Sequence, residues 1–198
     1  MPGPLPTLTT ANASYVTDRL LVGGDLDTRD EQLAASQLHE LVEAGVTHLV
    51  DARVEWDDTQ WVARLAPQVA YLHHGMDDAG QQVPAAWFDR GVDWALEAIE
   101  GGGTVLTHCH MGVNRGPSLG FAVLLAQGWD AVQALDAIRG ARPIAWVAYA
   151  DDALRWHHGR AGSKIGALDT DLRRVARWRS ENELDLEAVI RQKRSQGF

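Results

Sequence analysis

The stretch VLTHCHMGVNRGPS at residues 105–118 holds residue types that could act together on a phosphate group. It contains Cys109, the only cysteine of the chain, and Arg115 follows six positions later. A cysteine thiolate is a strong nucleophile, and a guanidinium can donate two parallel hydrogen bonds to phosphate oxygens. The spacing therefore predicts a cysteine that attacks a phosphoryl group held by the arginine.

The elements around this stretch favour the same chemistry. Val105 and Leu106 predict a buried strand, and Pro117 predicts the first turn of a long apolar helix. A loop between a strand and a helix N-terminus can turn its backbone N–H groups inward and bind an anion. This positive environment also favours the thiolate form of Cys109. The residues expected to bind phosphate are His110, Met111, Gly112, Val113, Asn114 and Arg115.

The pattern His108-Cys109, two residues, Gly112, two residues, Arg115 resembles the signature loop of the cysteine-based protein tyrosine phosphatases. From about residue 15 to residue 158, the order of elements is similar to the small dual-specificity branch of that superfamily, including DRLLVG at 18–23 and THLV at 47–50. The resemblance implies a phosphomonoester hydrolase that acts through a cysteinyl-phosphate intermediate without a cofactor. It also implies that His108 supports the loop.

Such a reaction needs an acid that protonates the leaving oxygen. The resemblance implies an aspartate about thirty positions before the cysteine, where the chain has Met76-Asp77-Asp78-Ala79-Gly80. An ungapped alignment on Tyr71-Leu72 and Trp87-Phe88 places Asp78 on the acid, with Asp77 as the alternative. The same five residues are also typical of a solvated turn.

Arg53 is a further candidate for substrate binding, because it follows a predicted strand at the same edge of the sheet. An ion pair of Arg53 with Asp51 or Glu55 at the surface is the alternative. His108-Cys109-His110 does not predict a metal site, since adjacent residues seldom converge on one ion and no second Cys/His cluster is present.

One position departs from the phosphatase pattern. The residue after the loop arginine is usually Ser or Thr, whose hydroxyl helps the thiolate leave, but here it is Gly116. Three alternatives to a working phosphatase therefore stay open. They are a phosphate-binding pseudophosphatase, a rhodanese-like sulfur transferase, and an RNA 5′-triphosphatase, whose loop His110 and Val113-Asn114-Arg115 resemble.

Composition limits the remaining classes of function. The chain of 198 residues has a net charge of −9, which argues against a nucleic-acid or anionic-membrane binder. A single cysteine cannot form an internal disulfide, and no apolar run reaches the length of a membrane span. We therefore expect a cytoplasmic protein whose partner is a phosphorylated protein or a small phosphoester.

Strand and helix patterns alternate along the chain, which predicts an α/β domain with a mostly parallel sheet of four to five strands. A flexible tail is expected over 1–14, the catalytic domain over 15–160 and a helical extension over 161–198. The extension carries eight Lys and Arg against six Asp and Glu. Its two amphipathic helices are expected either to pack on the acidic domain or to serve docking or self-association.

The expected elements, by residue range, have recognisable signals at their ends. Thr28 and Glu31 predict a capping box, Pro84 predicts a first helical position, and Asp130 predicts an N-cap. Strands are expected at 19–24, 46–51, 69–74 and 105–108, and helices at 29–44, 59–65, 84–100, 119–126, 131–140, 145–157 and twice within 168–195.

Overall fold

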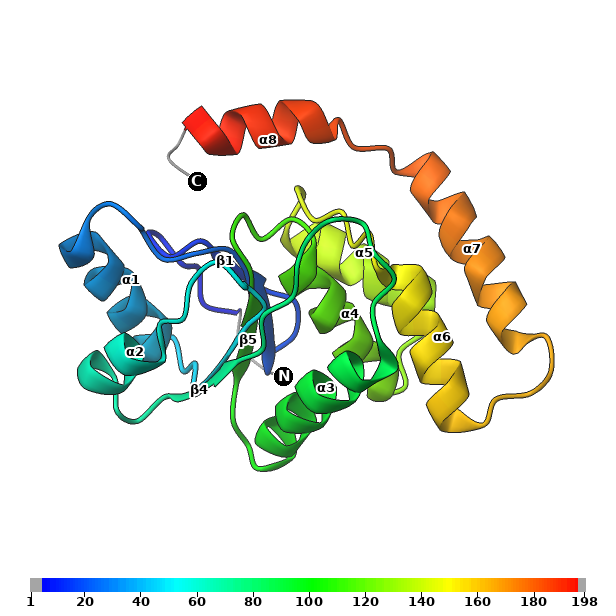
Figure 1. The fold of residues 1–198 in the computed structure, drawn as a ribbon, viewed down its shortest axis with the longest axis horizontal. Helices are drawn as coiled ribbons and strands as arrows, with labels where there is room; N and C mark the ends of the chain where they lie inside the picture. Colours follow the sequence, from blue (N-terminus) through cyan, green and yellow to red (C-terminus); the bar gives the residue numbers. More distant parts are fainter. Residues whose placement is uncertain (1–4, 196–198) are drawn as a thin grey trace.

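The computed structural model describes residues 5–195, and these form one five-stranded sheet with helices on both faces (Figure 1). The strand order is β1-β2-β5-β3-β4. Strand β1 pairs antiparallel with β2, and the other pairs are parallel. This confirms the predicted α/β class and the mostly parallel sheet. The strands are β1 Ala13–Tyr15, β2 Leu20–Gly23, β3 His48–Asp51, β4 Ala70–His73 and β5 Val105–His108.

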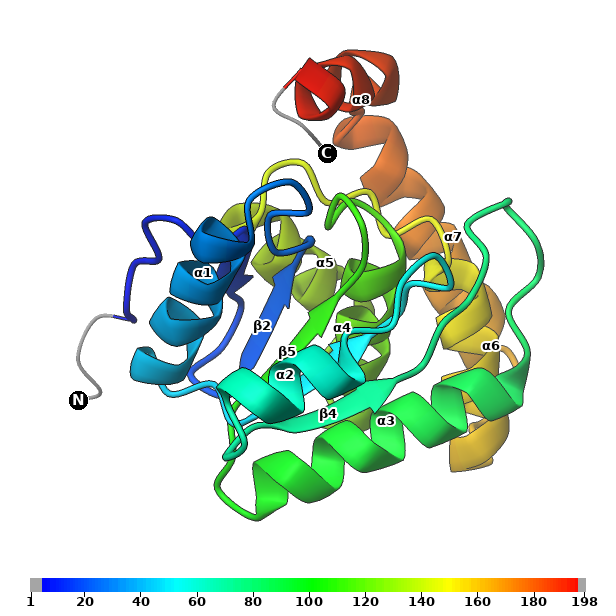
Figure 2. The same cartoon turned by 60° about the vertical axis from the view of Figure 1, so that its left-hand side comes forward.

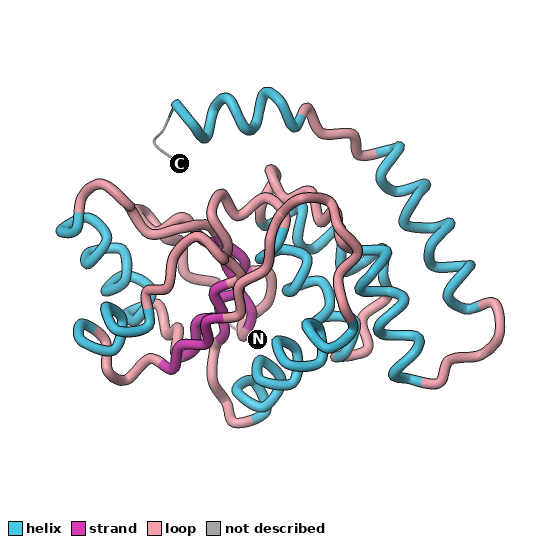
Figure 3. Tube along the Cα trace, viewed as in Figure 1, coloured by secondary structure: helices cyan, strands magenta, loops and turns pink. Residues whose placement is uncertain are grey.

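Eight helices lie within the described residues, and three of them connect one strand to the next (Figure 3). Their order along the chain places α1, α2 and α3 between strands and α4 to α8 after the last strand. They are α1 Glu31–Glu43, α2 Thr59–Leu65, α3 Ala85–Glu100, α4 Arg115–Ala126, α5 Ala131–Ala141, α6 Ala150–Ala161, α7 Ala167–Glu181 and α8 Leu186–Ser195.

Alternation along the strands divides the core into two layers. In β2, Leu20 and Val22 pack toward the α3–α7 side, whereas Leu21 packs toward α1 and α2. In β5, Val105 and Leu106 divide in the same way. Because successive side chains of a strand point to opposite faces, a four-residue apolar strand can serve both layers. Helix α4, nearly all buried, lies at the centre of the larger layer.

Four expected helix starts differ in the structure. Helix α4 begins at Arg115 rather than at residue 119. Helix α1 is capped by Asp30, whose side chain accepts from the N–H groups of Gln32 and Leu33, so the Thr28 capping box is wrong. Pro84 is the N-cap of α3 rather than its first residue. The helix expected from residue 145 begins at Ala150, because the chain turns through Val147 with a φ of 53°. The Asp130 N-cap of α5 is confirmed.

The segment expected to be a flexible tail is attached to the domain from Thr9 onward. The Glu40 carboxylate accepts hydrogen bonds from the backbone N–H groups of Thr9, Thr10 and Ala11. Strand β1 then begins at Ala13, so the tail prediction is wrong for residues 9–14. Residues 1–4 of that prediction lie outside the described part of the chain.

Helix α7 packs back on the domain. This is one of the two arrangements expected for the C-terminal extension. Its Val175 and Trp178 are buried in the main core, and Arg174 and Arg179 pair with Asp130 and Asp151. Helix α8 lies beyond the loops at the carboxyl ends of the strands in both views (Figure 2). None of the described helices is long and apolar enough to cross a membrane.

Candidate active site

The register of the sheet brings the residues that end three strands to one rim. His108 of β5 pairs with Gly23 of β2 and with Asp51 of β3. Cys109 comes directly after this row and is 3% exposed. Ligand sites of parallel sheets lie beyond the carboxyl ends of the strands, so the position of Cys109 is that of a site residue.

The loop after Cys109 turns its carbonyl groups outward. The carbonyl oxygen of Met111 accepts from Arg142 and that of Val113 accepts from the N–H of Trp146, at 3.0 and 2.7 Å. The backbone N–H groups of residues 110–114 have no hydrogen-bond partner among the described residues. Helix α4 begins at Arg115 with its N-terminus toward the same loop. The loop is therefore a nest of free donors suited to an anion.

Arg142, a residue that the sequence did not single out, holds this loop shape. Its guanidinium is buried and donates to the carbonyl oxygens of Gly112 at 2.6 Å and Met111 at 3.0 Å. It also donates to the Asn12 side chain at 2.7 Å. Gly112 has a φ of 65°, and a Cβ there would lie 2.5 Å from the backbone of Gly23, so only glycine fits. An arginine just after a predicted helix carried no signal that it would fold under the loop.

Arg115 lies at the far end of the loop and is nearly buried. Both terminal nitrogens donate to the Glu55 carboxylate at 2.8 Å, and one also donates to the carbonyl oxygen of Met76 at 2.9 Å. Its Nε is buried and makes no hydrogen bond among the described residues. Hydrogen bonds from Arg115 lower the pKa of Glu55 to about 2. Glu55 therefore fixes the fork while the Nε edge stays available to a phosphate oxygen.

Asp78 lies against the loop, in the connection between β4 and α3. Its Oδ1 accepts from the side-chain amide of Asn114 at 2.6 Å and from the hydroxyl of Tyr149 at 3.1 Å. Its Oδ2 is 3.6 Å from Nε of Arg115. The Asp77 carboxylate is exposed and forms no hydrogen bond or ion pair within the described part of the chain. Of the two candidates for the acid, the structure brings Asp78 to the loop.

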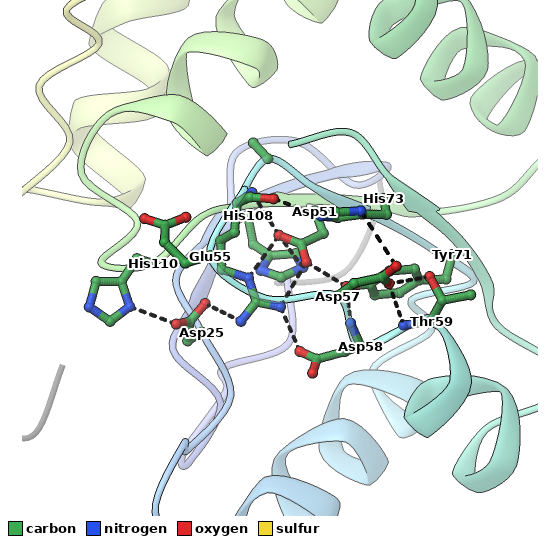
Figure 4. A network of polar contacts seen from close by, with 12 residues as sticks. Asp25, Asp51, Glu55, Asp57, Asp58, Thr59, Tyr71, His73, His108 and His110 are labelled. Atoms are coloured by element: carbon green, nitrogen blue, oxygen red, sulfur yellow. Dashed lines mark hydrogen bonds and ion pairs between the residues drawn. The ribbon is translucent and has the colours of Figure 1, made fainter. Parts of the chain in front are cut away.

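Arg53 pairs with the carboxylates of a buried ionic network rather than with the loop. Figure 4 shows the labelled carboxylates of this network, among them Asp25, Asp51 and Asp58. Arg53 pairs with Asp25 at 2.9 Å, Asp51 at 2.7 Å and Asp58 at 2.5 Å, and its side chain is 2% exposed. The pairing with Asp51, one alternative from the sequence, is thus present, although the pair is buried rather than at the surface. The three carboxylate partners of Arg53 offset its charge, which argues against the expected role in binding phosphate.

His110 is held in place by the same network. The backbone N–H of Asp25 donates to the His110 carbonyl oxygen at 2.8 Å, and the two side chains meet at 2.7 Å. Asp25 is fully buried, and this burial raises its pKa to about 6. The His110 ring stacks on Trp56 with 6.1 Å between ring centroids. Neither Asp25 nor Trp56 was singled out by the sequence, because only the fold brings them to His110.

The His108 side chain is buried and makes no hydrogen bond to the loop. Its Nδ1 has no partner among the described residues, and its Nε2 is 3.9 Å from Asp51. Burial lowers the pKa of this imidazole to about 4, so it is neutral at pH 7. Its carbonyl oxygen accepts from the N–H of Ala52 at 2.9 Å. Hydrogen-bond support of the loop by the side chain, as the resemblance implied, is thus absent here, and Arg142 makes those contacts instead.

Gly116 lies where the chain is too close to β5 for any side chain. A Cβ at this position would lie 2.8 Å from Cα of His108 and 2.9 Å from the Thr107 carbonyl oxygen. The Ser118 hydroxyl donates to the Asn114 side chain at 3.1 Å and so is committed elsewhere. Neither residue supplies the hydroxyl that the phosphatase pattern places after the arginine.

The assembled site can bind a tetrahedral dianion next to a nucleophile. Free N–H groups and the Nε of Arg115 belong to the loop that follows Cys109, and Asp78 lies against the same loop, next to Asn114 and Arg115. Within residues 5–195, no group of three or more His, Cys, Asp or Glu side chains has the geometry of a metal site. The residues present suit covalent phosphoryl chemistry by a cysteine.

Solved structures with this arrangement of elements are known, although no family model matches the sequence and no curated protein matches it closely. Human DUSP28 superposes with a TM-score of 0.64 at 23% identity, over 76% of this chain and 99% of that one. PTPMT1 in complex with PI(5)P gives 0.64 at 17% identity, over 76% and 97%. A human tyrosine phosphatase-like serine/threonine/tyrosine-interacting protein gives 0.57 at 16% identity, over 75% and 97%. The chain therefore has the fold of the dual-specificity phosphatase-like branch of the cysteine-based protein tyrosine phosphatase superfamily.

Proposed function

We propose that this protein is a cysteine-dependent phosphomonoesterase. The observation that carries the proposal is the set of unpartnered donors around one cysteine, namely the N–H groups of residues 110–114 and the Nε of Arg115. Buried donors without partners are costly unless a ligand or solvent satisfies them. A phosphate dianion accepts several such hydrogen bonds at once and places its phosphorus atom near Cys109.

The reaction then has two steps. The Cys109 thiolate attacks phosphorus, the bond to the ester oxygen breaks, and Asp78 gives its proton to that oxygen. Water next attacks the phosphocysteine, Asp78 takes a proton from the water, and the sulfur–phosphorus bond breaks to return the thiolate and inorganic phosphate. Arg115 and the loop N–H groups stabilise the charge on the transferring group in both steps.

The substrate class follows only in part from the site. The structure of PTPMT1 was solved in complex with PI(5)P, a phosphoinositide. This ligand is a property of PTPMT1 and does not by itself identify the substrate of the present chain. The loop of this chain has no lysine between Cys109 and Arg115, and its overall charge is −9, which favours phosphorylated proteins over polyanionic lipids. A panel of phosphotyrosine, phosphoserine and phosphothreonine peptides, with PI(5)P beside them, separates these substrates.

A phosphate-binding pseudophosphatase is the second candidate, and Gly116 is the observation that favours it. The hydroxyl that assists thiolate departure is missing, and the space at residue 116 excludes it. Binding and the first attack do not require that hydroxyl. The two candidates therefore differ in steady-state turnover rather than in phosphate affinity.

The deciding experiment is hydrolysis of para-nitrophenyl phosphate by the wild type, Cys109→Ser and Arg115→Lys. We expect turnover by the wild type, none above background by Cys109→Ser, and a large loss with Arg115→Lys, because lysine lacks the planar fork. Full activity in Cys109→Ser would contradict the mechanism. Tight binding of inorganic phosphate without any turnover would favour the pseudophosphatase.

A further inference from the structure

A cavity of about 290 Å³ lies beside the phosphate loop and takes no part in the proposed reaction. Residues 26–29 after β2, with Glu31 and Ala34 of α1, form one wall. Trp56, from the connection between β3 and α2, and Trp61, from α2, form others. Asp58 and the buried Arg53 complete it. The cavity therefore lies between the segments that follow β2 and β3, two strands that lie on either side of β5.

Trp56 connects this cavity to the phosphate loop. One face of its indole stacks on the His110 ring, with 6.1 Å between centroids, and the residue also lines the cavity. Trp56 is 49% exposed although it is large and apolar. The Glu55 side chain, next to Trp56 in sequence, points inward to Arg115. The side chains on either side of it, Val54 and Trp56, are exposed. An exposed tryptophan held at the rim of a site is suited to contact a ligand rather than the core.

Carboxylates outnumber arginines around the cavity by three to two, since Asp27, Glu31 and Asp58 line it together with two arginines. Glu31 also pairs with Arg64 at 3.3 Å. The charge of one of the two lining arginines, Arg53, is already offset by Asp25, Asp51 and Asp58. Asp27 accepts hydrogen bonds from the N–H groups of Arg29 and Asp30, which lower its pKa and keep it ionised. Arg29 is thus the cation lining the cavity that is not surrounded by carboxylates.

We propose that this cavity is a subsite for a positively charged side chain that flanks the phosphorylated residue of a peptide substrate. The guanidinium of such a side chain can stack on Trp56 while the Asp27 carboxylate lines the same cavity. Adjacent Cα atoms of a peptide are about 3.8 Å apart, so a residue near a phosphoresidue bound in the loop can reach past one tryptophan ring. The net charge of −9 attracts basic peptides to the protein as a whole.

This inference rests on the proposed function for the phosphate loop but concerns a separate contact. It is therefore tested by binding rather than by turnover. Two phosphotyrosine peptides are compared, one with arginine next to the phosphotyrosine and one with citrulline, which has the same shape without the charge. Dissociation constants are measured by fluorescence anisotropy on Cys109→Ser, which does not hydrolyse them.

We expect the arginine peptide to bind about 3- to 30-fold more tightly than the citrulline peptide. Adding Trp56→Leu should bring this ratio close to one. Adding Arg29→Gln should raise the ratio of the two affinities, because it removes a positive charge that repels the arginine of the peptide. The hydrogen bond from the backbone N–H of residue 29 to Asp27 would remain. Trp129→Leu is the matched control, since Trp129 is 38% exposed in the turn between α4 and α5 and should leave the ratio unchanged.

Equal affinity for the two peptides in the Cys109→Ser background would overturn the subsite. A preference that persists in Trp56→Leu, or that is lost equally in Trp129→Leu, would also overturn it. Failure of the proposed function is distinct, since the wild type would then not hydrolyse either peptide or para-nitrophenyl phosphate, whatever the binding ratio.

Discussion

Glu55 holds the guanidinium of Arg115 through two hydrogen bonds of 2.8 Å, one to each terminal nitrogen. The two residues come from different connections of the sheet, and their contact fixes the orientation of the arginine before any phosphate arrives. The third nitrogen, Nε, lies 3.6 Å from Asp78 and has no hydrogen bond of its own within the described residues. Glu55 is thus a positioning residue for the arginine that binds phosphate.

Replacing Glu55 with alanine should release the Arg115 fork. Charge-assisted hydrogen bonds contribute about 1.5–3 kcal/mol each, and part of this is lost to solvent because the Glu55 side chain is 39% exposed. We therefore expect kcat/KM for para-nitrophenyl phosphate to fall by about 10- to 100-fold. Glu43→Ala, an exposed glutamate of α1, is the control. Tighter binding of phosphate by Glu55→Ala would mean instead that Glu55 competes with the substrate.

Arg142 should matter as much as residues that touch substrate, although it acts through the loop. Its fork bonds two successive loop carbonyls, and lysine cannot reproduce that geometry. Arg142→Lys should raise KM and weaken inhibition by inorganic phosphate, with a fall in kcat/KM of about 10-fold or more. The KM effect should exceed the kcat effect because the donors of the loop would lose their alignment. Wild-type phosphate affinity in Arg142→Lys would show that the loop keeps its shape without these bonds.

Asp78 should be important in proportion to the basicity of the leaving group. Asp78→Asn should slow hydrolysis of an alkyl phosphate by about 100-fold or more and affect an activated aryl phosphate much less. Asp77→Asn is the matched control, because Asp77 lies one residue away with its carboxylate in solvent. If the leaving-group dependence appears in Asp77→Asn and not in Asp78→Asn, the acid is the neighbouring residue.

The missing hydroxyl at Gly116 should slow the second step selectively. A hydrogen bond to a charged group contributes about 1.5–3 kcal/mol, which corresponds to a deficit of about 10- to 150-fold in hydrolysis of the phosphocysteine. Rapid mixing with para-nitrophenyl phosphate should then give a burst of phenolate followed by a slower steady state. Gly116→Ser is not expected to correct this, since its Cβ would lie 2.8 Å from the backbone of His108. A linear time course without a burst would contradict this account.

His108 should make the protein less stable as pH falls. Burial lowers its pKa from 6.5 to about 4, so the unfolded chain takes up a proton in a range where the folded chain does not. Stability is therefore lost between about pH 6.5 and 4, by at most about 3 kcal/mol. His108→Asn should flatten the pH dependence of the free energy of unfolding in this window, measured by urea titration. The exposed His39→Asn should leave the slope unchanged, and an unchanged slope in His108→Asn would contradict the assignment.

The sequence predicted the elements that carry strong local signals. Alternating strands and helices, the strand before Cys109 and the Asp130 cap all follow from residue patterns over a few positions. Helix starts were predicted less well where several caps compete. Asp30 takes the N-cap of α1 because Asp27 already bonds the N–H groups of Arg29 and Asp30, which turns the chain before the helix.

Long-range partners could not be predicted in the same way. Glu55 and Arg115 are 60 positions apart, and Asn12 and Arg142 are 130 apart, so no local pattern joins them. The burial of Arg53 among three carboxylates could not be predicted either, because Asp25 is 28 positions away from it. The fold brings the two residues together through β5, which pairs with both β2 and β3. Packing at Gly116 likewise depends on how closely α4 approaches β5.

The central claim is that Cys109 carries the phosphoryl group during the reaction. The direct measurement is mass spectrometry of the wild type, quenched in acid within the burst phase after mixing with para-nitrophenyl phosphate, with peptides mapped after digestion. We expect the peptide containing Cys109 to gain the mass of one phosphoryl group, and Cys109→Ser to lose both this label and turnover. Turnover without any label on Cys109, with activity retained in Cys109→Ser, would contradict the account.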